Sequence, residues 1–98
     1  MPEDEVTRSA LAELAAEYAA ELPGLIDELA RLVDAAAADP AAVPHARAAA
    51  HRLRGTAGSY GFKAVGEAAG SIEDALEAGA ADVSGLVCVL AALVRPPS

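Results

Sequence analysis

Residues 43–60 of the chain read VPHARAAAHRLRGTAGSY. At about 100° per residue, the apolar side chains of this stretch fall on one helical stripe, which consists of Ala46, Ala50, Leu53, Ala57 and Tyr60. The pattern predicts a helix that has Pro44 in its first turn and runs to about Tyr60, where Gly61 permits a left-handed stop. Because such a helix is apolar on one side only, other helices must cover that side.

An earlier apolar pattern predicts a long first helix. It is capped at Thr7 or Ser9, closes at Asp39, and repeats apolar residues at three- and four-residue steps: Leu11, Leu14, Tyr18, Leu22, Leu25, Leu29 and Leu32. Pro23 lies inside this pattern, and a proline removes one backbone hydrogen bond and clashes with the preceding turn. We therefore expect the first helix to be kinked or broken near Pro23.

Two more helices follow the central stretch. The third is expected from Phe62 to about Ala78, with an apolar stripe of Val65, Ala68, Ala69, Ile72, Ala75 and Leu76. The fourth, capped by Asp82 or Ser84 and stopped at Arg95, carries Leu86, Val87, Val89, Leu90 and Leu93. Four amphipathic helices joined by short loops predict an all-α fold, an up-down antiparallel four-helix bundle.

The length and composition are consistent with one small helical domain. Ninety-eight residues fit a single domain spanning 1–98, with 1–6 and 96–98 expected to be frayed. Ala, Leu, Glu and Arg are frequent, and these residues favour helices. Much of the hydrophobic content is Ala, so we expect close packing between small side chains.

The charge and the single cysteine limit the classes of partner. A net charge of -8 argues against binding to nucleic acid or to an anionic membrane, so we expect the partners to be proteins. We expect the chain itself to be a monomer. The longest apolar run, Leu86 to Val94, is too short to span a membrane. Cys88 has no second cysteine to pair with, so we expect it to be buried in a protein of the reducing cytoplasm.

The helical stripe of residues 43–60 leaves His51 on the opposite, solvent-facing side. Arg47 lies one turn before His51, Arg54 and Gly55 lie one turn after it, and Gly58 lies two turns after it. The segment from residue 40 to residue 66 contains four basic residues and no acidic one. The sequence therefore predicts a basic island around an exposed imidazole.

This combination suits phosphoryl chemistry on a histidine. A neutral ring nitrogen is a competent nucleophile near pH 7, and Arg47 and Arg54 could offset the charge of a transferring group. Glycines inside a helix cost about 1 kcal/mol each relative to Ala, so Gly55 and Gly58 indicate close approach by another backbone, with Gly55 leaving room over the ring. No metal site or nucleotide-binding loop accompanies His51, which predicts a carrier that other proteins phosphorylate, not an enzyme.

The run from His51 to Phe62, HRLRGTAGSYGF, resembles the signature of histidine phosphotransfer (HPt) domains. That signature is His-x-Leu-Lys-Gly with a second Gly ten residues after the His, here Gly61. Residues 17–23 are similar to part of the family's first long helix. In this chain Arg54 stands where the family usually has Lys, a change that keeps the charge and alters the geometry.

The resemblance implies a four-helix bundle with a phosphohistidine at His51, whose phosphoryl group exchanges with an aspartate of a receiver domain. Gly55 would be the position that opens access to the ring. The partners would be a response-regulator receiver, a hybrid sensor histidine kinase, or both. The chain would need no cofactor of its own, because the receiver contributes the Mg²⁺.

Two other functions are compatible with a small helical bundle. An adaptor could dock a receiver or kinase through the same face without accepting phosphate. A metal-binding or catalytic bundle is a weaker hypothesis, because the apolar stripes contain no inward-facing Glu and His ligands. His45 lies six residues from His51, off its face of the helix, and we assign it no role.

Overall fold

The computed structural model describes residues 2–80 and 83–94, and for residues 2–6 only the backbone. It contains four α-helices and one short 3-10 helix, namely α1 (Pro2–Ala38), η1 (Pro40–Ala42), α2 (Val43–Ser59), α3 (Lys63–Ala78) and α4 (Val83–Val94). The described residues include no β-strand. The prediction of an all-α fold with four helices is confirmed.

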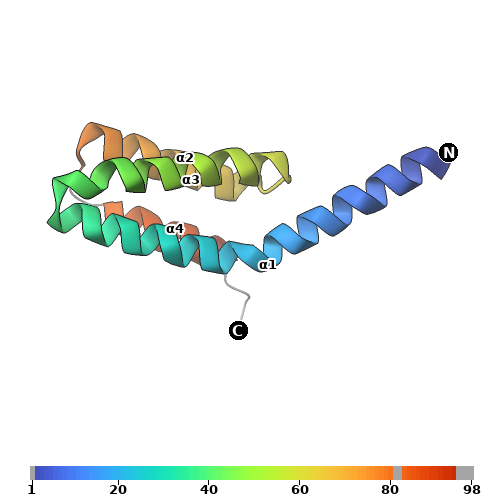
Figure 1. The fold of residues 1–98 in the computed structure, drawn as a ribbon, viewed down its shortest axis with the longest axis horizontal. Helices are drawn as coiled ribbons and strands as arrows, with labels where there is room; N and C mark the ends of the chain where they lie inside the picture. Colours follow the sequence, from blue (N-terminus) through green and yellow to red (C-terminus); the bar gives the residue numbers. More distant parts are fainter. Residues whose placement is uncertain (1, 81–82, 95–98) are drawn as a thin grey trace.

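The four α-helices pack side by side. Helix α2 contacts both α1 and α3, and α4 contacts both α3 and α1, so the contacts close into a ring. The sequence colours in Figure 1 show that the chain reverses its direction from each α-helix to the next. The most extensive of these contacts joins α2 to α3, the two helices that carry the candidate site.

The core combines a few large side chains with many alanines. Leu29, Ile72 and Leu90 are its largest fully buried members. The stripe predicted for residues 43–60 does face the core, with only Tyr60 partly exposed, and the stripe predicted for the third helix is buried or half-buried. Both stripes are confirmed.

The three aromatic residues of the chain form one cluster at an end of the bundle. The ring of Tyr18 on α1 stacks on Tyr60, with 4.7 Å between centroids, and lies 5.8 Å from the ring of Phe62. The Tyr18 hydroxyl shares a 2.6 Å hydrogen bond with Oγ1 of Thr56. Tyr18 therefore fastens α1 to the α2–α3 connection, where Gly61 adopts the left-handed conformation expected from the sequence.

Helix α1 differs from its prediction at its start and at Pro23. It begins at Pro2, so the predicted caps at Thr7 or Ser9 are wrong. It also continues through Pro23 without interruption, so a break at this position is wrong, and a kink there stays a prediction. Fraying of residues 1–6 also stays a prediction, while residues 96–98 lie outside the described residues.

The first part of α1 reaches beyond the other helices (Figure 1). The apolar period predicted for this helix therefore continues past the bundle, where nothing in the described chain covers it. Leu11 is 58% exposed, and Leu14 is also exposed. Leu25 is exposed too, although it lies beside α2 within the bundle. Inside the bundle, Ile26 and Val33, which the predicted stripe omits, are buried instead.

Helix α4 is apolar over most of its surface. Ser84 lies inside this helix, so it is not the cap, and both Asp82 and Arg95 lie outside the described residues. Cys88 is exposed, so its predicted burial is wrong, because the inward face of α4 is taken by Val83, Val87 and Leu90. Over the described ranges, none of the helices is long and apolar enough to cross a membrane.

Candidate functional site

His51 projects from the outer face of α2. The side chains one residue before it and two residues after it, Ala50 and Leu53, are buried, which turns position 51 away from the core. The imidazole side chain is 74% exposed. The structure therefore places His51 on the surface, as the sequence predicted.

One carboxylate from the neighbouring helix holds this imidazole. The Nδ1 atom of His51 lies 2.8 Å from Oε2 of Glu73 on α3, and the Glu73 side chain is only 16% exposed. A carboxylate can only accept a hydrogen bond, so Nδ1 carries the proton and donates it. In the neutral ring, Nε2 then holds the reactive lone pair.

The two helices run antiparallel in a fixed register around this contact. Each step forward along α2 is matched by an equal step back along α3, through ion pairs at one end and through glycines at the other. The matched positions are Arg47 with Glu77, His51 with Glu73, Arg54 with Gly70, and Gly58 with Gly66. These residues recur at three- and four-residue steps, so they form one face of each helix.

Arg54 lies next to the same carboxylate. Its Nη1 atom is 3.4 Å from Oε1 of Glu73, so this carboxylate faces Arg54 with one oxygen and His51 with the other. The Arg54 side chain crosses Gly70 and remains about half exposed. The side chains of His51 and Arg54 therefore meet at the same carboxylate.

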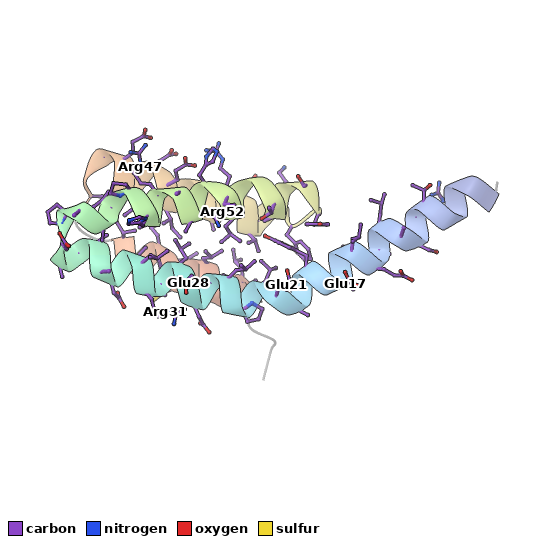
Figure 2. The ribbon with its side chains drawn as sticks, in the orientation of Figure 1. Glu17, Glu21, Glu28, Arg31, Arg47 and Arg52 are labelled. Atoms are coloured by element: carbon purple, nitrogen blue, oxygen red, sulfur yellow. The ribbon has the colours of Figure 1, made fainter. Side chains whose placement is uncertain are left out.

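The predicted basic island does not exist as an uncompensated surface. Arg47 pairs with Glu77 at 3.0 Å, and Glu73 lies beside Arg54, because α3 brings acidic residues next to a segment of α2 that has none. Arg52 does not belong to this face. It lines a separate groove between α2 and α1 together with Glu21 and Glu28 (Figure 2).

The glycines of α2 and α3 have different surroundings. A Cβ atom added to Gly55 or Gly58 would meet no atom within 4 Å, so packing inside the chain does not require either glycine. A Cβ added to Gly66 would lie 3.3 Å from the Arg54 carbonyl oxygen, which makes Gly66 the position of close backbone approach. Approach of a partner over Gly55 and Gly58 stays a prediction.

The sequence reasoning missed Glu73 and Gly70. Both lie on α3, next to its apolar stripe, so they belong to the edge of the helix that faces α2. The signal in the sequence was a second helix with internal glycines, Gly66 and Gly70, which allow a neighbour to come close. The described residues contain no group of three or more His, Cys, Asp or Glu side chains that could hold a metal ion.

The match to a family model agrees with this geometry. The model of the Hpt domain matches residues 13–94, most of the chain, and the chain therefore belongs to the Hpt domain family. A search of curated proteins and a search of solved structures each returned no match. Membership implies a histidine phosphotransfer role in a phosphorelay, as a phosphocarrier that works with receiver or kinase partners.

Proposed function

We propose that this Hpt domain relays a phosphoryl group between His51 and the aspartate of receiver domains in two-component signal transduction. The single observation that carries the proposal is the state of the His51 ring. Its side chain is 74% exposed, while Nδ1 is held 2.8 Å from Glu73, which leaves Nε2 as the nitrogen that can react. An exposed and oriented imidazole is what a partner's active site must find.

The transfer requires no proton to move, because the attacking nitrogen already holds a free lone pair. The Nε2 lone pair attacks the phosphorus of the receiver's aspartyl phosphate, the N–P bond forms, and the P–O bond to the aspartate breaks. The aspartate leaves as a carboxylate, and Nδ1 keeps its proton. Glu73 then stabilises the positive charge that the ring acquires, because its carboxylate accepts the Nδ1 hydrogen bond.

The other candidate residues have supporting roles in this proposal. The Arg54 guanidinium offsets the negative charge of the transferring group, and Arg47, one turn before His51, adds positive potential although Glu77 neutralises part of it. Gly55 and Gly58 leave the surface beside the ring open, since a Cβ at either position would point into empty space. A partner loop could approach the ring over these two positions.

Family membership supports a wider assignment. We propose a monomeric cytoplasmic domain spanning 1–98, an up-down antiparallel bundle whose first helix is kinked near Pro23. Its partners are a response-regulator receiver, a hybrid sensor histidine kinase, or both. The domain itself needs no cofactor, because the Mg²⁺ for the transfer is held by the receiver.

Phosphorylation by a receiver tests the proposal. A phosphorylated receiver with Mg²⁺ should label the protein with an acid-labile, alkali-stable phosphate, and His51→Gln should abolish the label. The matched control is His45→Gln, because His45 is an exposed histidine of the same helix and should be dispensable. Circular dichroism should show unchanged helix content in both variants.

Two results would contradict the proposal. A label that survives His51→Gln would mean that the phosphate is carried elsewhere. Absence of label with every receiver of a genomic panel, together with receiver binding that survives His51→Gln, would instead establish the adaptor that docks without accepting phosphate.

A further inference from the structure

The Arg54 side chain packs against Gly70 of α3, a residue that has no side chain. A Cβ atom added to Gly70 would lie 3.2 Å from Nε, 3.3 Å from Cδ and 3.4 Å from Cζ of Arg54. These distances are shorter than ordinary carbon contacts, so a side chain at position 70 would force a displacement. The contacted atoms belong to a long, half-exposed side chain and not to the backbone, so the guanidinium group would move and the helices would stay in place.

A small displacement of the Arg54 guanidinium group matters because its contact with Glu73 is long. Its Nη1 atom is 3.4 Å from Oε1 of Glu73, near the outer limit of a hydrogen bond, and the other Glu73 oxygen holds His51. A shift of the guanidinium by a few tenths of an ångström outward would break the first contact. It would also move the positive charge away from the ring.

We propose that Gly70 is a positioning residue for phosphoryl transfer: its missing side chain lets the Arg54 guanidinium lie against α3, beside Glu73 and within reach of a phosphoryl group on His51. The positioning follows from the contacts at Gly70, whereas its consequence for transfer rests on the proposed phosphotransfer function.

The contacts also make residues 54 and 70 a matched pair. Two of the three close atoms, Nε and Cζ, belong to the planar guanidinium group, which a lysine lacks. A lysine at position 54 would have an unbranched, freely rotating chain that can avoid a Cβ at position 70. The glycine at 70 is therefore required by arginine at 54, the residue with which this chain departs from the Lys of the family pattern.

Four proteins test this pairing: the wild type, Gly70→Ala, Arg54→Lys and the double variant. Gly24→Ala is the matched control, because Gly24 is also inside a helix and a Cβ there meets no atom within 4 Å. The first readout is the ¹⁵N NMR spectrum of the Arg54 and His51 side chains in the unphosphorylated protein. The second is the single-turnover rate of transfer from a phosphorylated receiver, measured beside the thermal midpoint.

Gly70→Ala should shift the Arg54 Nε resonance and slow transfer roughly tenfold, the equivalent of one charge-assisted hydrogen bond, without lowering the thermal midpoint. In the Arg54→Lys background, Gly70→Ala should slow transfer no further. Gly24→Ala should leave both readouts at the wild-type values.

Unchanged Arg54 resonances in Gly70→Ala, or an equal loss of rate from Gly70→Ala in both backgrounds, would overturn the inference. A wild type that takes no phosphate from any receiver would overturn the proposed function instead. In that case the NMR readout still decides whether Gly70 positions Arg54.

Discussion

The α2–α3 half of the molecule and the α1–α4 half are built from different kinds of side chain. Helices α1 and α4 bury large aliphatic residues, namely Leu22, Ile26, Leu29, Val33, Val83, Val87 and Leu90. Where α2 meets α3 the buried positions are mostly small, with Ala46, Ala50, Ala57, Gly66, Ala69 and Gly70 among them. Small side chains let two helix backbones come close, whereas large ones remove more apolar surface from water.

This difference separates the source of stability from the source of the site. Glu73 contacts His51, and the Arg54 side chain packs against Gly70. Both contacts require α3 to lie close to α2 in one register. The described contacts of this face join α2 to α3, whereas most of the large aliphatic burial lies in the α1–α4 half. Substitutions in the α1–α4 half should therefore lower the free energy of unfolding most, whereas substitutions between α2 and α3 should also change the geometry of the site.

The largest loss of stability is expected for Leu22→Ala in α1. Leu22 is a buried member of the core, and truncation of such a residue removes apolar burial and leaves a cavity, at a cost of about 2–5 kcal/mol. The matched control is Leu11→Ala in the same helix, which should change stability by less than about 0.5 kcal/mol because Leu11 is exposed beyond the bundle. Urea denaturation followed by circular dichroism gives both values.

Equal losses for Leu22→Ala and Leu11→Ala would contradict this prediction. They would mean that the first part of α1 is packed in solution, against another part of the chain or a second molecule.

A smaller loss is expected for Gly66→Ala in α3. The new Cβ would lie 3.3 Å from a backbone oxygen, which cannot rotate away as a side chain can, so α2 and α3 must separate slightly. Overpacking of this kind costs about 1–3 kcal/mol, more than the improved helix propensity returns. Gly58→Ala, on the other side of the same contact, meets no atom and should instead stabilise the protein by up to about 1 kcal/mol.

Stabilisation by both alanines would show that the α2–α3 distance adjusts freely. The close approach would then not be a fixed property of the interface, and the register of α2 and α3 would not fix the position of Glu73 beside His51.

Much of the fold could be predicted because it depends on periodicity. The α2 stripe from Ala46 to Ala57 is buried, and the α3 stripe from Val65 to Leu76 is buried or half-buried, as the three- and four-residue steps predict. Periodicity does not report how far a bundle extends, so the predicted apolar pattern of the first helix includes Leu11, which is exposed. The predicted burial of Cys88 is wrong for a related reason. Nearly every face of α4 is apolar, so the pattern does not indicate which face is covered.

The site was predictable in part for the same reason. The exposure of His51 follows from the α2 stripe alone, and the helix-face arithmetic places Arg54 near it. Glu73 could not be found in this way, because its proximity depends on the packing distance and register of two helices that are separated in sequence. The predicted basic island is wrong because a segment free of acidic residues can still lie against acidic residues from elsewhere in the chain.

The smallest change in stability, with a clear change in function, is expected for Glu73→Gln. Glutamine has nearly the same volume as glutamate, and the two partners of Glu73, His51 and Arg54, are mostly exposed, so the loss of the charge should cost less than about 1 kcal/mol. The amide of glutamine can also donate to Nδ1, which would move the ring proton to Nε2 and occupy the reactive nitrogen. We expect transfer to slow by roughly tenfold or more, because the wrong tautomer cannot attack.

The matched control, Glu77→Gln, removes the Arg47 pair from the same face of α3 and should leave the His51 tautomer unchanged. Long-range ¹H–¹⁵N NMR of the His51 ring reports the tautomer directly, and a proton that stays on Nδ1 with an unchanged transfer rate would show that the ring needs no carboxylate to orient it.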